Sequence, residues 1–215
     1  MTVMQNYAEL LFTDAVKAYQ EQVGMRETYE RIYTNRHRGP LDDDTIAFLS
    51  GSTSFYIATT GSNGWPYIQH RGGPAGFVKI LGPDMIGFAD YLGNRQFITR
   101  GNLDGSDRVS LFFMDYPRRA RLKMLGEARM VDAASDPELQ NALAQDGRGP
   151  VERLMTIKIV ARDWNCPKYI LPRYTEEQVA QLIAPRLNEL VEENQQLKAR
   201  VAQLESGQSP ATKSE

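Results

Sequence analysis

Seven short stretches rich in aromatic and β-branched residues, spread over residues 54–161, constrain the fold of this chain more than any other feature. They read SFYIATT, WPYIQHR, FVKIL, MIGFAD, RVSLFFM, RARLKMLGEARMV and MTIKIVA. Sequences such as GSNG, GGPAG and LGPD lie between them and are typical of tight turns. Because most of these connections are too short for crossover helices, we predict an antiparallel sheet of six or seven strands that curls into a barrel. The expected fold class is mainly β with flanking helices, α+β.

Helical patterns flank and interrupt this series. Residues 6–37 show helical spacing of apolar side chains with a break at Gly24, which predicts two helices. The stretch LDDDTIAFL predicts a short helix with Asp42 or Asp43 as its N-cap. A second short helix is expected after Asn94. A third covers about 136–145, with Asp136 as cap and Pro137 at its first position.

The chain therefore divides into four expected parts. Residues 1–41 form an N-terminal helical segment and residues 42–174 the barrel domain. Residues 175–206 form a C-terminal helix, and the small polar residues of 207–215 form a disordered tail.

The C-terminal helix carries apolar side chains at alternating spacings of three and four. The series is Leu187, Leu190, Asn194, Leu197, Val201 and Leu204. This heptad pattern predicts a parallel two-stranded coiled coil, in which Asn194 fixes the register. An amphipathic helix lying on its own barrel is the alternative. Pro185 is expected to end an earlier short helix, so that the zipper begins near it.

Composition limits the possible functions. Lys and Arg number 25 and Asp and Glu 27, so no basic nucleic-acid surface is expected. A single cysteine and two histidines exclude an intrachain disulfide and leave no Cys/His cluster for a metal. We find no signal peptide and no apolar run long enough to span a membrane, so we expect neither membrane insertion nor export and place the protein in the cytoplasm.

The stretch DYLGNRQF, residues 90–97, stands where a strand gives way to a helix. Gly93 permits a tight or positive-φ turn, Asn94 is a good N-cap, and the helix that it opens would offer free N–H groups to an anion. Arg95 adds a guanidinium suited to phosphate. The alternative is an ordinary capped helix with an exposed arginine.

Further cations accompany this turn. Arg71 and Lys79 flank a Gly-rich connection, and Arg119, Arg121 and Lys123 alternate along one predicted strand. Side chains at alternate positions leave the same face of a strand and repel one another unless a negative group covers them. Together with Arg95 they predict a local anion site, although each group singly also fits a solvated basic surface.

Several motifs together resemble a known family. The segments WPYIQHRGGPAGFVKIL, GFADYLGNRQFI, GNL and RVSLFFMDYPRRARLKMLGEAR, extended by DWNCPKYI at 163–170, resemble the pyridoxamine 5′-phosphate oxidase-like, FMN-binding split-barrel proteins over roughly residues 42–174. The resemblance implies a six-stranded split barrel and a homodimer with FMN at its interface. The residues that it implies for cofactor binding are Lys79, Asn94, Arg95, Gln96, Arg71, His70, Arg121, Asn165 and Cys166.

The sequence also departs from this family. Gln96 stands where the family's phosphate turn has a cation, and Arg121 stands where the oxidases carry a glutamine near the flavin. The carboxyl-terminal arginine and histidine motif that holds the oxidase substrate is not visible, so oxidation of pyridoxamine phosphate is not expected. Cys166 is either a group that contacts flavin or substrate or an inert thiol, and His70 either contacts the flavin or is structural.

The first functional hypothesis is therefore a dimeric FMN oxidoreductase that acts on a small organic substrate or a nicotinamide. The second is a non-catalytic flavin carrier or sensor. A split barrel that binds haem or a deazaflavin is a further alternative within the fold. Catalytic residues are not assigned, and no metal, nucleic-acid or membrane partner is expected.

Overall fold

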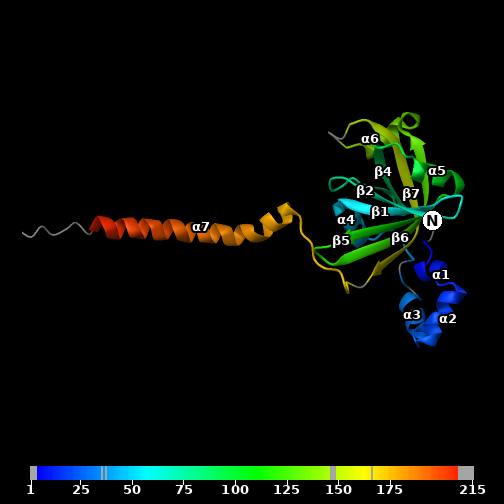
Figure 1. Cartoon of the computed structure of the whole chain (residues 1–215), viewed down its shortest axis with the longest axis horizontal. Coiled ribbons are helices and arrows are strands. Elements are labelled where there is room, and N and C mark those ends of the chain that lie inside the picture. The colour runs from blue at the N-terminus through cyan, green and yellow to red at the C-terminus, as the bar shows by residue number, and fades with distance from the viewer. Residues whose placement is uncertain (1–3, 35, 37, 146–148, 166, 208–215) are drawn as a thin grey trace, which may run out of the picture. The chain divides into compact units, whose positions relative to one another are not determined.

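The protein is described by a computed structural model that covers residues 4–34, 36, 38–145, 149–165 and 167–207 (Figure 1). The chain divides into two compact units, Met1–Ile170 and Leu171–Glu215. The first contains the sheet and the shorter helices, and the second contains one long helix.

The sheet contains seven strands, all antiparallel to their neighbours, in the order β2-β1-β5-β6-β7-β4-β3. This confirms the predicted mainly β, α+β class, with one strand more than the six that the family resemblance implies. The strands are β1 (Ser54–Thr60), β2 (Pro66–Gly72), β3 (Lys79–Gly82), β4 (Met85–Tyr91), β5 (Arg108–Asp115), β6 (Ala120–Asp132) and β7 (Val151–Asn165).

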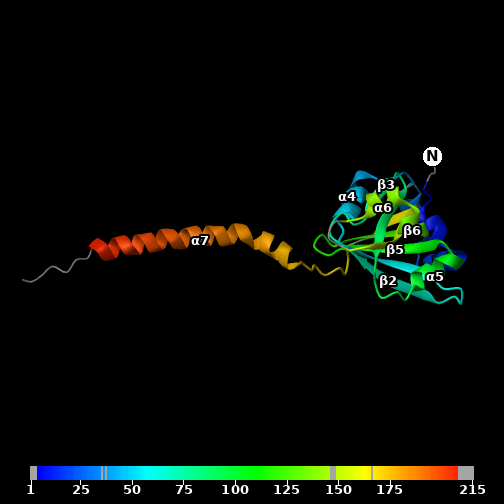
Figure 2. The same cartoon turned by 90° about the horizontal axis from the view of Figure 1, so that it is seen from above.

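The sheet is curved (Figures 1 and 2), and a cluster of buried apolar side chains forms its core. Phe55 lies at its centre, with ring centroids 4.6 Å from Phe113 and 5.4 Å from Phe88. All three rings are at most 2% exposed. Because β1, β4 and β5 contribute these rings, inward-pointing residues of well-separated strands meet, as closure into a barrel requires. Gly126 lies at an irregularity of the β6–β7 ladder, where a Cβ would stand 2.6 Å from Ile157 and 2.9 Å from the carbonyl oxygen of Lys158.

The helices of the first unit follow the predicted pattern with one change in number. The described part of residues 6–37 contains three helices, not two, because Thr13 caps a second helix only two residues after the first one ends. The helices are α1 (Tyr7–Leu11), α2 (Asp14–Gln22), α3 (Arg26–Tyr33), α4 (Asp43–Gly51), α5 (Ile98–Gly105) and α6 (Pro137–Leu143), and a 3₁₀ turn, η1, spans Ala133–Ser135.

The predicted caps of α4 and α6 are confirmed. Asp42 accepts a hydrogen bond from the backbone N–H of Thr45 at 2.9 Å, and Asp136 accepts one from Leu139 at 3.0 Å. Buried Arg162 on β7 also donates to Asp42, at 3.0 Å. Burial alone would raise the pKa of Asp42, but the hydrogen bonds from Thr45 and the nearby Arg162 outweigh it, and the pKa lies below its ordinary value. Asp42 therefore links the start of α4 to β7.

The second unit is the helix α7, Glu176–Gly207. It runs through Pro185 without a break, so the expected end of a helix at that residue is wrong. Proline removes one backbone hydrogen bond, but helix-forming residues on both sides continue the turn. The tail predicted to be disordered at 207–215 lies, from residue 208, outside the described residues. Among the helices described, none combines the length and apolar character needed to cross a membrane.

Candidate functional site

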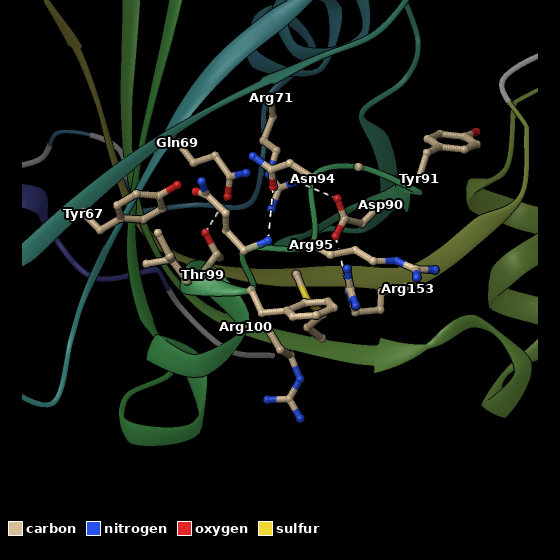
Figure 3. A pocket seen from close by; sticks show the side chains of 15 residues that line it. Tyr67, Gln69, Arg71, Asp90, Tyr91, Asn94, Arg95, Thr99, Arg100 and Arg153 are labelled. Carbon is tan, nitrogen blue, oxygen red and sulfur yellow. Dashed lines mark hydrogen bonds and ion pairs between the residues drawn. The ribbon is translucent and has the colours of Figure 1, made fainter.

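An arginine-rich pocket of about 290 Å³ lies between β2, the end of β4 and the beginning of α5 (Figure 3). β2 is one edge of the sheet, whereas β4 lies next to the opposite edge. The pocket therefore forms where the curled sheet brings its two ends together. Its lining comprises Tyr67, Gln69, Arg71, Asp90, Tyr91, Gly93, Asn94, Arg95, Gln96, Phe97, Ile98, Thr99, Arg100, Met130 and Arg153.

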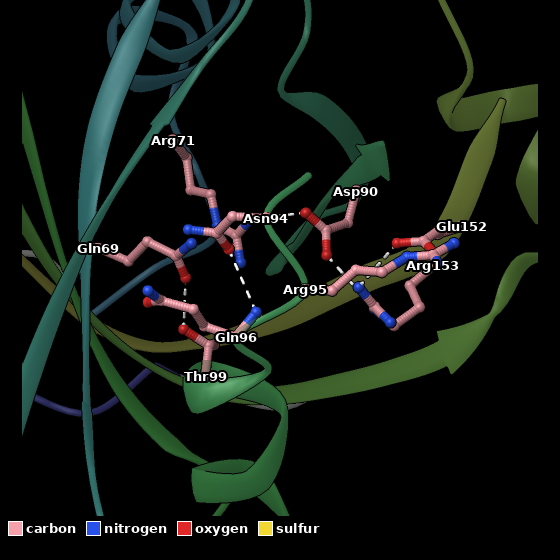
Figure 4. Close-up of polar contacts among 9 residues, drawn as sticks. All are labelled: Gln69, Arg71, Asp90, Asn94, Arg95, Gln96, Thr99, Glu152 and Arg153. Atoms are coloured by element: carbon pink, nitrogen blue, oxygen red, sulfur yellow. Dashed lines mark hydrogen bonds and ion pairs between the residues drawn. The ribbon is translucent and has the colours of Figure 1, made fainter. Parts of the chain in front are cut away.

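A chain of alternating charges crosses this pocket (Figure 4). Asp90 accepts from Arg71 at 2.5 Å and from Arg153 at 3.4 Å. Glu152 pairs with Arg153 at 3.2 Å and with Arg95 at 2.8 Å. Three guanidinium groups thus share two carboxylates, which leaves one net positive charge. An anion that enters the pocket would meet this surplus.

The loop before α5 has a strained backbone. Arg95 and Phe97 both have φ near +56°, a region that residues other than glycine seldom adopt. Gly93, at which we predicted a tight or positive-φ turn, is not among the described glycines with positive φ. In this conformation the ring of Phe97 lies 4.7 Å from the guanidinium of Arg153. Strain of this kind persists where surrounding contacts enforce it, and it occurs often at binding sites.

The prediction that Asn94 is the N-cap of α5 is wrong. Phe97 occupies the N-cap position of α5, and no side chain accepts from the first turn. Asn94 instead accepts a hydrogen bond from the backbone N–H of Gln96 at 3.2 Å, an Asx turn within the loop. The first-turn N–H groups of α5 consequently lack both an intrahelical partner and a side-chain cap, and this helix end faces the pocket.

Four of the nine predicted cofactor residues line the pocket together: Arg71, Asn94, Arg95 and Gln96. His70 does not line it. Side chains alternate along β2, so Gln69 and Arg71 face the pocket while His70 faces Tyr56 on β1, with ring centroids 5.6 Å apart. His70 borders another hollow, of about 240 Å³, and Arg71, Asp90 and Tyr91 line both this hollow and the arginine-rich pocket.

The other predicted residues lie elsewhere. Lys79 begins β3, at the opposite end of the sheet order from β2, and does not line the pocket. Arg71 and Lys79 lie on strands that follow one another along the chain but stand at opposite ends of the sheet order. Arg121 is paired with Asn165 between β6 and β7, and its Nε is buried without a hydrogen-bond partner. Cys166 lies outside the described residues, as does the side chain of Asn165. Arg121 is absent from the residues that line the arginine pocket.

We expected a bound anion to neutralise the alternating basic residues of β6. In the structure a carboxylate of the protein pairs with one of them. Lys123 pairs with Asp163 of β7 at 3.1 Å, and the carboxylate is 2% exposed. This pair borders a second hollow, of about 710 Å³, beneath α2 and α3. Burial, followed by the nearby Asp163 carboxylate, raises the pKa of Tyr33 in this hollow to about 12. Arg119 precedes β6 and donates to the carbonyl oxygen of Pro167 at 3.4 Å.

Sequence reasoning missed several residues of the pocket. Gln69 accepts a hydrogen bond from the hydroxyl of Thr99 at 2.6 Å, which ties β2 to α5. Strand alternation from Arg71 would have found Gln69. Arg153 and Glu152 follow β4 by about sixty residues, and no local pattern indicates that they reach this loop. Within the described chain, no group of three or more His, Cys, Asp or Glu residues is arranged to hold a metal ion.

Comparison with known proteins gives one family match over more than half of the chain. The family described as Pyridoxamine 5′-phosphate oxidase matches residues 41–161. A search of curated proteins finds no significant match.

A comparison with solved structures finds matches to part of this chain. HupZ from Group A Streptococcus is 13% identical, with a TM-score of 0.46 over 62% of this chain and 98% of the other. A Clostridium acetobutylicum protein related to general stress protein 26 of Bacillus subtilis, of the pyridoxinephosphate oxidase family, is 18% identical, with a TM-score of 0.40 over 57% and 85%. An F420 reductase is 15% identical, with a TM-score of 0.39 over 54% and 94%. These values are too low to support an inference about cofactor or activity.

Proposed function

The chain belongs to the pyridoxamine 5′-phosphate oxidase family, and we propose that it binds FMN and transfers electrons or hydride between the flavin and a small organic substrate or a nicotinamide. The observation that carries the proposal is the charge chain of the arginine pocket. Its surplus positive charge lies beside the uncapped N-terminus of α5. A phosphate monoester, with a charge between −1 and −2 near neutral pH, matches such a site.

The donor groups of the pocket fit the phosphate end of FMN. The Nε of Arg71 is buried without a hydrogen-bond partner in a residue that lines the pocket. Leaving such a donor unpaired costs about 1–3 kcal/mol, which an acceptor from a ligand would recover. Arg95 is 59% exposed and reaches the pocket from the strained loop, so it can turn from Glu152 towards a ligand.

In this proposal Arg71, Arg95 and the first-turn N–H groups of α5 hold the phosphate, and Asn94 and Gln96 shape the turn around it. Gln69 and Thr99 offer polar atoms to the ribityl chain. The role predicted for Lys79 gains no support from the pocket geometry, since it lies on β3 outside this lining.

The pocket is small for a whole flavin nucleotide. Its 290 Å³ is just below the roughly 300–1,000 Å³ of common ligand sites. We therefore assign the phosphate and ribityl portions to this pocket and expect a second copy of the chain to cover the flavin ring. The partner's copy of the β6–β7 region, which carries Arg121, is the candidate for that contact.

The flavin, when bound, supplies the electron or hydride chemistry. The chain's own residues position it and set the local field. Among the described residues that line the pocket, Asp90 is the only one with a carboxylate, and Arg71 and Arg153 pair with it. The same set of residues includes no histidine, cysteine or lysine. Tyr67 and Tyr91 are the lining side chains that can exchange a proton, and because this pocket is assigned to the phosphate and ribityl portions, a non-catalytic flavin carrier is the second candidate.

Reconstitution with FMN tests the binding proposal. We expect the purified protein to take up FMN and to show protein-bound flavin bands. Arg95→Gln should weaken FMN binding about tenfold or more, because a hydrogen bond to a charged group contributes about 1.5–3 kcal/mol. Arg31→Gln, which changes an exposed arginine of α3, is the matched control. A wild-type protein that remains colourless in excess FMN contradicts the proposal.

Reduction under anaerobic conditions separates the two candidates. An oxidoreductase that uses a nicotinamide should lose its flavin absorbance when NADH or NADPH is added, and regain it when an acceptor is admitted. A carrier should bind FMN and remain oxidised. Free FMN at the same concentration is the control for direct chemical reduction.

A further inference from the structure

The helix α7 presents a continuous apolar stripe. Apolar residues that are 45–58% exposed recur along it with heptad spacing, namely Ile183, Leu187, Leu190, Leu197, Val201 and Leu204. None of its 32 residues is buried. An amphipathic helix of this length gains its stability mainly by packing its apolar face against a partner.

The unbroken helix lengthens the seam beyond Pro185. With Leu187, Asn194 and Val201 at a positions, the preceding heptad places Ala180 at a and Ile183 at d. Eight consecutive a and d positions, from Ala180 to Leu204, therefore lie on one continuous helix. Pro185 takes position f, which faces away from a coiled-coil seam. Nearly four heptads meet the length at which such repeats indicate a coiled coil.

Charges beside the seam suit a second copy in parallel. In a parallel pair, each g residue faces the e residue five positions later on its partner. Glu193 then faces Lys198 of the partner subunit, and Arg200 faces Glu205 of the partner subunit. By symmetry each attractive pair occurs twice, and the remaining pair, Arg186 with Val191 of the partner subunit, carries no repulsion.

Asn194 distinguishes the two orientations. In a parallel, in-register pair the two copies of Asn194 meet and their amides can hydrogen-bond. In an antiparallel pair centred on the same seam, Asn194 instead faces Leu190 of the partner subunit, which leaves its amide unpaired at a cost of about 1–3 kcal/mol. Polar residues at single a positions fix register in this way.

We propose that α7 binds a second copy of this chain as a parallel, in-register, two-stranded coiled coil over residues 180–205. Val201 at a with Leu197 and Leu204 at d, together with Asn194, favours two strands over three or four. The coiled coil joins the two protomers independently of any flavin. In this parallel pair, the C-terminal ends of the two α7 helices lie side by side.

Disulfide trapping in the full chain tests this proposal. Leu197→Cys and Leu187→Cys place a thiol on the seam, whereas Leu182→Cys, at position c, places one on an equally exposed outer face. Each variant retains Cys166, so Leu182→Cys also controls for linkage through that residue. In a glutathione redox buffer we expect the seam variants to form interchain disulfides at least tenfold more readily than the control.

Mixing two variants tests the orientation. Tagged Leu187→Cys and untagged Leu197→Cys lie ten residues apart, about 15 Å along a helix, beyond the reach of a disulfide in a parallel pair. An antiparallel pair would bring these positions together. The parallel coiled coil predicts linkage only between like positions. Frequent linkage of position 187 to 197, or equal linkage at 182 and 197, overturns the proposal.

Charge reversal gives a second, independent measurement. Lys198→Glu replaces each attractive pair with Glu193 by a pair of like negative charges, twice in each dimer, and should lower disulfide formation in the Leu197→Cys background roughly tenfold. Adding Glu193→Lys restores opposite charges and should restore the yield. If the reversal has no effect or the second change does not rescue it, the pairing is wrong. Because none of these measurements involves flavin, failure of FMN binding would leave their outcome unchanged.

Discussion

Arg71 on β2 donates to Asp90 on β4 at 2.5 Å, and both side chains are only 13% exposed. β2 is the first strand in the sheet order and β4 the sixth. A single ion pair therefore joins two distant parts of the sheet across the place where the barrel would otherwise be open. Asp90 also holds Arg153, so its carboxylate serves both closure of the barrel and assembly of the pocket.

Asp90→Asn should destabilise the folded protein by roughly 3 kcal/mol, because it leaves two largely buried guanidinium groups without their shared carboxylate. Urea unfolding measures the change. Inorganic phosphate should recover part of the loss by neutralising the same arginines. Asp104→Asn, which removes an exposed i,i+4 partner of Arg100 on α5, should change stability by less than about 0.5 kcal/mol. Equal effects of the two substitutions would contradict this role of Asp90.

Glu152→Gln should strengthen anion binding. Glu152 occupies the guanidinium of Arg95 at 2.8 Å, so a phosphate must compete with it for that group. Removing the competing charge leaves a larger positive surplus, and we expect about a two- to fivefold lower dissociation constant for FMN or inorganic phosphate. Isothermal titration calorimetry measures the dissociation constants of both ligands, and Glu138→Gln, which changes an exposed glutamate, is the control. Weaker binding by Glu152→Gln would mean that the glutamate positions Arg95 for the ligand.

Tyr33 should make stability depend on pH in the alkaline range. Burial, followed by the nearby Asp163 carboxylate, raises its pKa from 10.0 to about 12. The folded state therefore retains the phenol proton more strongly than the unfolded state. This difference in pKa contributes to the free energy of unfolding. The contribution is fully present below pH 10 and is lost as pH rises from 10 to 12.

Unfolding free energies measured from about pH 9 to 12 should fall less steeply for Tyr33→Phe than for the parent chain. Tyr19→Phe, which removes a tyrosine that is 71% exposed, is the control. A phenolate absorbance titration follows the same group directly. Identical pH profiles for the parent chain and Tyr33→Phe would show that this tyrosine does not contribute the expected linkage.

Local sequence patterns accounted for most of the secondary structure. Strands recur where β-branched and aromatic residues alternate between turns, and Asp42 and Asp136 cap helices by reaching N–H groups only three residues away. Such contacts depend on neighbours in the chain. Local rules failed where other contacts decided the backbone: residues before α4 form three helices instead of two, helix α7 continues through Pro185, and Phe97 instead of Asn94 occupies the N-cap position of α5.

The sequence by itself determined a series of six or seven antiparallel strands and the loop that carries Arg95. Only the tertiary structure decided which charges meet. Strand alternation kept His70 out of the lining of the arginine-rich pocket, the sheet order removed Lys79 from it, and closure brought Arg153 and Glu152 to a loop far away in sequence. The reason is physical. Hydrophobic periodicity is set by residues a few positions apart, whereas an ion pair between strands depends on how the whole sheet curves around its core.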